Sequence, residues 1–156
     1  MQIMNPSLRF LLLSAICCAW AFVQQANATA YSIAFQTQES PNLVGQINCQ
    51  DGDECSTEFE VSYKEQKISI EMSVRAQPGN LNIWFKAGGH ELWVGDNREL
   101  HIPIAEGRLA KAEVIISFPG DRAKSRSDSR VQHPVLVSPG PPLCKLVIFA
   151  FAETSR

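Results

Sequence analysis

The sequence lacks every catalytic or cofactor signature of useful specificity. It contains no Gly-x-Ser-x-Gly elbow, no phosphate-cradling glycine loop and no Cys-x-x-Cys pair. Histidine is scarce, with only three residues in the chain. The formal net charge is −2, which gives no electrostatic reason to expect binding to nucleic acid or to an anionic membrane surface. We therefore expect no cofactor and favour a non-enzymatic binding function.

Charge is almost absent from residues 1–30, where Arg9 is the only charged side chain. The apolar run "FLLLSAICCAWAFV" follows it, and small residues then alternate in "ANATA". A basic start, an apolar stretch below spanning length and an Ala-x-Ala pattern are typical of a cleaved secretory signal peptide. We expect cleavage after Ala28 or Ala30, no stable membrane anchor, and an exported protein that is either periplasmic or secreted.

Helical spacing is absent from residues 31–156, where period-two alternation of apolar and polar residues dominates. Runs such as "KISIEMSVRA" and "NLNIWFKA" are of strand length, and turn signals such as "QPGN", "AGG" and "PGD" separate them. About nine such runs occur within a length that suits one domain. The pattern predicts an all-β fold, a single-domain antiparallel β-sandwich or small β-barrel of about eight to nine strands.

The segment 120–142 departs from this pattern because it is polar, serine-rich and then proline-rich. Each proline removes a donor from a strand ladder, so we predict a flexible polar and proline-rich loop here. An alternative is a loop that contacts an anion. That interpretation rests on four basic residues: Arg122, Lys124, Arg126 and Arg130.

Three cysteines follow residue 30: Cys49, Cys55 and Cys144. A hairpin loop centred on Gly52 places Cys49 opposite Cys55, at a distance that a disulfide tolerates. We therefore predict the Cys49–Cys55 disulfide, although a Cys49–Cys144 bond would constrain the unfolded chain more, by ~5 kcal/mol against ~2 kcal/mol. Cys144 opens an apolar run that is typical of a buried strand, and a nucleophile formed by Cys144 with His133 is accordingly disfavoured.

The turn in "KAGGHE" determines one strand register. A two-residue turn at the glycine pair places Lys86 opposite Glu91 and Trp84 opposite Trp93. The two tryptophans then share one face of the hairpin, and aliphatic side chains occupy the other.

The following loop decides which residues join the tryptophans. A three-residue loop at 95–97, with Asn97 left-handed, places Glu99 and His101 on the tryptophan face. It also makes two cross-strand pairs, Leu92 with Leu100 and His90 with Ile102. A two-residue turn would bury Glu99 among the aliphatic side chains, at a cost of several kcal/mol. It would also put His90, His101 and Glu99 on one face as a weak zinc site, which we do not expect.

A second possible metal site is the acidic turn of the cysteine hairpin. Its three carboxylates belong to Asp51, Asp53 and Glu54. A calcium loop needs more oxygen ligands at set positions, so we expect a solvated turn and no metal.

The predicted face contains six residues: Trp84, Lys86, Glu91, Trp93, Glu99 and His101. Tryptophans surrounded by polar groups are typical of protein interfaces, which predicts a module that recognises a protein partner, of inhibitor, immunity or accessory type. A carbohydrate-binding module that stacks a glycan on the same rings is one alternative. A small hydrolase centred on His101 with Glu91 or Glu99 is another. If another segment covers both rings, the face binds nothing.

Overall fold

The computed structural model describes residues 29–39, 41–42, 44–120 and 139–154. The predicted signal peptide therefore lies outside the described residues, apart from Thr29 and Ala30, which open the first strand. Most of the predicted loop at 120–142 also lies outside them. Within the described ranges, no helix has the length and apolar character needed to cross a membrane.

Ten β-strands make up the regular structure of the described residues, which contain no helix. The strands are β1 (Thr29–Thr37), β2 (Gly45–Gln50), β3 (Glu54–Tyr63), β4 (Gln66–Gln77), β5 (Asn80–Ala87), β6 (His90–Glu91), β7 (Trp93–Val94), β8 (Leu100–Pro103), β9 (Leu109–Pro119) and β10 (Pro139–Thr154).

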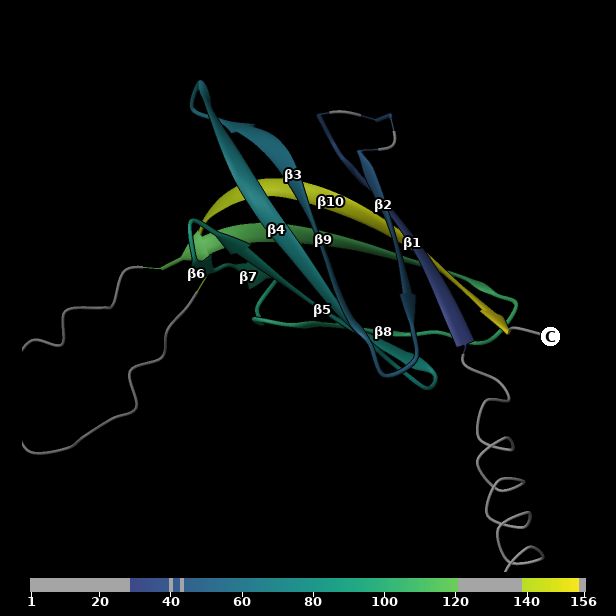
Figure 1. Ribbon diagram of the computed structural model, residues 1–156. Coiled ribbons are helices and arrows are strands. Elements are labelled where there is room, and N and C mark those ends of the chain that lie inside the picture. Colours follow the sequence, from purple (N-terminus) through teal and green to yellow (C-terminus); the bar gives the residue numbers. More distant parts are fainter. Residues whose placement is uncertain (1–28, 40, 43, 121–138, 155–156) are drawn as a thin grey trace, which may run out of the picture.

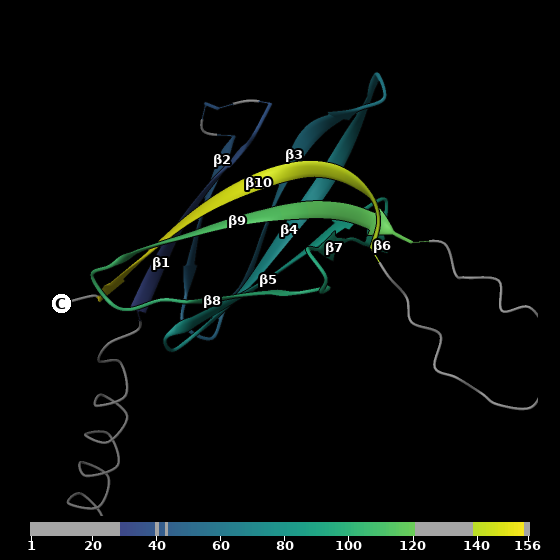
Figure 2. The same cartoon turned by 180° about the vertical axis from the view of Figure 1, so that it is seen from behind.

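The strands form two antiparallel sheets that pack face to face. Sheet A has the strand order β2-β1-β10-β9-β7, and sheet B has the order β3-β4-β5-β6, with β8 also paired to β5. The long strands β9 and β10 arch together behind β3, β4 and β5 in Figure 1, and Figure 2 shows the same two layers from the opposite side. The predicted antiparallel β-sandwich is confirmed. It has more strands than the eight or nine expected because one expected strand is divided into β6 and β7.

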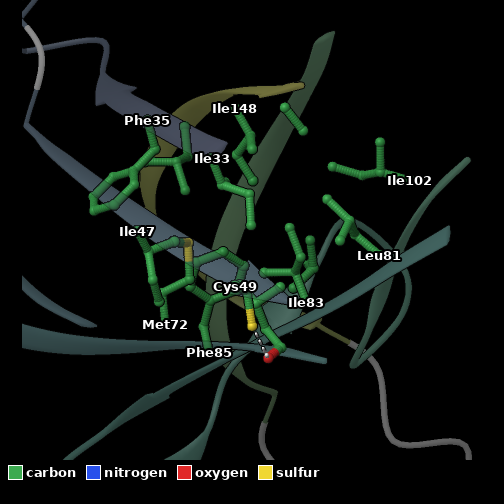
Figure 3. Close-up of a cluster of buried hydrophobic side chains, with 14 of the residues drawn as sticks. Ile33, Phe35, Ile47, Cys49, Met72, Leu81, Ile83, Phe85, Ile102 and Ile148 are labelled. Carbon is green, nitrogen blue, oxygen red and sulfur yellow. Dashed lines mark hydrogen bonds between the residues drawn. The ribbon is translucent and has the colours of Figure 1, made fainter. Parts of the chain in front are cut away.

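The core lies between the two sheets, where alternate residues of each strand face inward. Ile33 and Phe35 of β1 enter it from sheet A, while Ile83 and Phe85 of β5 enter it from sheet B, and all four are fully buried. Figure 3 shows these side chains converging in the space between the layers. The period-two alternation of the sequence therefore indicates correctly which residues face the core.

The predicted disulfide is present, since Cys49 and Cys55 are bonded with a Cα–Cα distance of 6.0 Å. The predicted hairpin around it is wrong. Cys49 lies on β2, which pairs with β1, and Cys55 lies on β3, which pairs with β4. The disulfide therefore connects the edge strands of the two sheets.

The turn between the two cysteines explains this arrangement, because its backbone groups bond to both sheets. The N–H of Asp51 donates to the carbonyl of Thr29 in sheet A at 3.0 Å, and the N–H of Gly52 donates to the carbonyl of Ala76 in sheet B at 2.9 Å. These bonds hold the turn across the end of the sandwich, so β2 and β3 leave it into different layers.

The segment from β6 to β8 also differs from the predicted three-strand meander. The pair Lys86–Glu91 is confirmed, but the chain then crosses to sheet A, where Trp93 pairs with Ser117 of β9. The ladder between β5 and β6 ends at the Lys86–Glu91 pair and Trp93 lies in sheet A, so the predicted Trp84–Trp93 pair is wrong. Trp84 pairs with Ser73 of β4. After the crossing, β8 returns to the edge of β5.

The predicted three-residue loop at 95–97 is wrong as well. Two backbone hydrogen bonds of 2.7 and 3.1 Å join Val94 to Asn97, so the turn consists of Gly95 and Asp96. Gly95 has a φ of 59°, whereas Asn97 is not left-handed.

The pairs predicted for the last strand of the meander do not form, because β8 pairs with β5 rather than with residues 90–94. Leu100 lies opposite Ile83, and Ile102 lies opposite Leu81. Ile102 is nevertheless buried and His101 exposed, as expected. The predicted alternation of inward and outward residues in β8 is correct, because β8 pairs with β5 and the aliphatic side chains of β5 face the same core.

Strand β10 begins at Pro139, so part of the predicted loop at 120–142 belongs to a strand. Register shifts occur on either side of Pro142, where the ladder with β9 is irregular. Such irregularities let the strand accommodate residues that cannot donate a backbone hydrogen bond.

Candidate binding site

The turn between β4 and β5 determines that Trp84 points outward. Gly79 has a φ of 74°, which glycine adopts at low cost, and the resulting register pairs Ser73 with Trp84. Ile83 and Phe85, on either side of Trp84, are fully buried, so the indole projects from the outer face of sheet B. Trp84 is half-buried there, and Ser73 opposite it is only 5% exposed. The ring is therefore neither a core residue nor fully solvated.

An interruption in the edge of sheet B creates a pocket beside Trp84. Strand β6 ends at Glu91 and β8 begins at Leu100, and the chain between them reaches sheet A through β7. The register of β8, extended by one residue, places Glu99 opposite Trp84. An open pocket of about 290 Å³ lies at this position. Its walls come from five residues: Arg75, Trp84, Glu91, Arg98 and Glu99.

Arg75 is held over Trp84 from the neighbouring strand β4. Its Cζ lies 5.4 Å from the centroid of the indole ring, within the range of a cation–π contact. Its Nη2 donates to Oε2 of Glu54 at 2.9 Å. The ring and the carboxylate together fix the orientation of the guanidinium at the pocket wall.

Arg98 is held in the same way on the opposite wall. The two-residue turn at 95–96 brings Arg98 back beside Trp93, with Cζ 5.7 Å from the ring centroid. Its Nη1 donates to Oε2 of Glu91 at 3.0 Å. Trp93 thus contributes to the pocket indirectly, by supporting an arginine that lines it.

Glu99 and His101 lie next to each other at the start of β8. Nδ1 of His101 is 2.7 Å from Oδ1 of Asn82, and because an amide oxygen only accepts, Nδ1 donates. The other ring nitrogen, Nε2, is 4.0 Å from Oε2 of Glu99. The imidazole is thus oriented toward Glu99, but His101 does not line the pocket.

The six predicted residues divide into two groups. Three line the pocket: Trp84, Glu91 and Glu99. The other three surround it: Lys86 and His101 on the outer face of sheet B, and Trp93 on the edge of sheet A.

Neither of the two arginines of the site was predicted from the sequence. A two-residue turn in "QPGN" pairs Arg75 with Asn82 and places it diagonally beside Trp84, so a local signal existed. The alternative to the predicted three-residue loop was a two-residue turn, and at 95–96, where the structure has it, such a turn brings Arg98 beside Trp93.

The residues described by the structure include no group of three His, Cys, Asp or Glu side chains that could hold a metal ion. Cys144 is a free, half-buried thiol, and His133, its conceivable catalytic partner, lies outside the described residues. Burial, with the negative charge of Glu39, raises the pKa of Cys144 to about 11. The thiol is therefore protonated at neutral pH and is a poor nucleophile.

Comparison with protein-family models, with curated proteins and with solved structures finds no match.

Proposed function

We propose that the chain is exported and serves as a non-enzymatic module that recognises a protein partner through the pocket at Trp84. The observation that carries this proposal is a half-buried indole that lines an open pocket of about 290 Å³ on an otherwise polar sheet face. An aromatic ring in a pocket with a charged rim is the usual composition of an interface anchor site.

The contacts of the two pocket arginines support the same function. Each arginine contacts one indole and one carboxylate, which favours one orientation of its side chain before a partner arrives. Ordered side chains lose little rotamer entropy on binding, and this favours affinity.

The test is capture of a protein from an envelope extract by the immobilised exported chain. Trp84→Ala should abolish the capture while near-ultraviolet circular dichroism reports an intact fold. Leu109→Ala is the matched control, because Leu109 is 67% exposed on the opposite sheet and its loss should leave capture unchanged. Capture that persists in Trp84→Ala would contradict the proposal.

A carbohydrate-binding module is the second candidate, favoured by the mixed charge of the pocket. Guanidinium donors and carboxylate acceptors beside an indole suit the hydroxyl groups and apolar face of a sugar ring. If residues 1–30 are removed, Trp84 and Trp93 are the only tryptophans, so their fluorescence reports directly on the site. A saturable shift with glycans that Trp84→Ala removes would favour this candidate, and a flat response across a broad panel would exclude it.

A hydrolase centred on His101 has less support from the geometry. His101 lies outside the pocket lining, and Glu91 is bonded to Arg98. Glu91 and Glu99 line the pocket, but the imidazole that would act with either of them does not, so the pocket holds no histidine–carboxylate pair for acid–base chemistry.

Export is supported by the composition of residues 1–30 and by the Cys49–Cys55 disulfide, a bond that persists in oxidising compartments. Cleavage after Ala28 is favoured over cleavage after Ala30, because the carbonyl of Thr29 accepts a hydrogen bond from Asp51. The mass of the exported protein tests this: a chain that begins at Thr29 is expected, and an uncleaved chain would contradict the proposal.

A further inference from the structure

Among the charged residues of the pocket, Glu99 differs from the rest in its ion pairing. Arg75 is bonded to Glu54 and Arg98 to Glu91, at 2.9 and 3.0 Å. For Glu99, the described residues provide only the imidazole of His101, with Nε2 4.0 Å away. Among the residues that the structure describes, one carboxylate of the pocket therefore has no lysine or arginine partner.

The environment of Glu99 also favours the pairing of its carboxylate with a cation. Its side chain is 39% exposed, against 56% for Glu91 and 53% for Glu54, so it is the most covered of the three. A partly desolvated carboxylate gains more from a cation than a fully solvated one does. The register places it directly opposite Trp84, whose ring offers an apolar surface.

The surrounding face of sheet B also has an excess of negative charge. Glu58 lies opposite Glu71 on neighbouring strands, an arrangement of like charges that costs stability in the isolated protein. No lysine or arginine among the described residues forms an ion pair with either of them, although Lys86 lies opposite Glu71 on β5. A positively charged partner would relieve this repulsion.

We propose, on the basis of the proposed function, that the pocket receives a lysine or arginine side chain of the partner protein. The aliphatic stem of that side chain packs against Trp84, and its charged head pairs with the carboxylate of Glu99. Long cationic side chains combine these two parts, and the pocket offers a surface for each. An anionic ligand fits less well, because a carboxylate at 2.9 or 3.0 Å already compensates part of the charge of each guanidinium, whereas Glu99 has no such partner among the described residues.

The test is titration of the exported chain with end-blocked tripeptides, monitored by tryptophan fluorescence. The probes are Gly-Lys-Gly and Gly-Arg-Gly, with Gly-Glu-Gly and Gly-Gln-Gly as comparisons. We expect saturable binding of the two cationic peptides and no response to the others. Glu99→Gln, which keeps the shape of the side chain, should weaken that binding at least fivefold, and Glu106→Gln, in the exposed turn between β8 and β9, should leave it unchanged. Equal responses to acidic and basic peptides, or an unaltered Glu99→Gln variant, would overturn the inference.

Protein capture separates this inference from the proposed function. If capture depends on Trp84 but neither Glu99→Gln nor an excess of Gly-Arg-Gly reduces it, the binding face stands and the cation pocket is refuted. If cationic peptides bind in a Glu99-dependent manner but no Trp84-dependent capture exists, the pocket is supported and the proposed function fails. N-acetyl-arginine amide provides a further comparison. If this single residue binds more weakly than Gly-Arg-Gly, the cationic side chain belongs to a protein. Equal binding would overturn the assignment to a protein in favour of a free cationic metabolite.

Discussion

The guanidinium of Arg98 lies over the indole of Trp93, with Cζ 5.7 Å from the ring centroid, across a turn of only two residues. The same side chain reaches Glu91 at 3.0 Å, so one arginine connects β6 to the turn that follows β7. A partly exposed cation–π contact and an exposed ion pair each contribute up to about 1 kcal/mol. We expect Arg98→Ala to lower the free energy of unfolding by about 1 kcal/mol, measured by urea denaturation.

Arg108→Ala is the matched control for this prediction, because Arg108 is exposed between β8 and β9 and its side chain forms no ion pair or cation–π contact with another described residue. Its removal should change the free energy of unfolding by less than about 0.5 kcal/mol. Equal effects of the two substitutions would show that Arg98 is an ordinary surface residue.

The disulfide between the two sheets gives a second prediction. Cys49 and Cys55 close a loop of about seven residues, and the loss of this constraint should reduce the free energy of unfolding by ~2 kcal/mol. The Cys49→Ser, Cys55→Ser double variant and the reduced wild-type protein should show the same decrease in urea denaturation. A double variant as stable as the oxidised protein would contradict the prediction, because its only designed change is loss of the bond between the edge strands.

The protection of Cys144 gives a third prediction. Burial, together with the negative charge of Glu39, raises the pKa of this thiol from 9.0 to about 11. Because only the thiolate reacts, alkylation by iodoacetamide at pH 8 should be about a hundredfold slower in the folded protein than in urea. Mass spectrometry of the chain without residues 1–28 measures the rate, and Cys144→Ser should show no alkylation in either state. A folded protein that reacts as fast as the unfolded one would show that partial burial does not protect the thiol.

The contrast between the Lys86–Glu91 pair and the Trp84–Trp93 pair shows how far sequence determines this fold. The first pair lies next to a two-residue glycine turn, so local geometry fixes it and the prediction is confirmed. The second lies two residues further from the turn, where the chain has left for sheet A. Alternation in "HELWVGD" is compatible with either sheet, because a side chain that faces the core does so from both. Only the long-range pairing with β9 decides the position of Trp93.

The disulfide illustrates the same limit. The short separation of Cys49 and Cys55 correctly identifies the bonded pair, but the partners of β2 and β3 depend on β1 and β4, which are distant in sequence. At the site, three of the six expected residues line one pocket. Arg75 was missed although the local turn in "QPGN" places it beside Trp84, and Arg98 was missed because the loop at 95–97 was predicted with three residues instead of two. Local turn geometry thus predicts which residues lie on the outer face of sheet B, whereas the pocket arises where the edge of sheet B is interrupted.

The hydroxyl of Tyr31 is buried at the end of the sandwich and connects both layers. It donates its single proton to Oδ1 of Asp51 at 2.7 Å, and the carbonyl oxygen of Gln77, at 3.0 Å, is a second acceptor within reach. Burial, the hydrogen bond to Asp51 and its negative charge raise the pKa of Tyr31 from 10.0 to about 12. The protonated form is thus favoured by folding, so the contribution of the hydroxyl to stability is complete below pH 10 and is lost as the pH rises to 12.

We expect the free energy of unfolding to decrease between pH 10 and pH 12 in the wild-type protein and to change less in Tyr31→Phe. At neutral pH the Tyr31→Phe variant should be less stable by about 1 kcal/mol. Identical pH profiles for the two proteins in urea denaturation would show that the hydroxyl is ionised as readily in the folded chain as in the unfolded one.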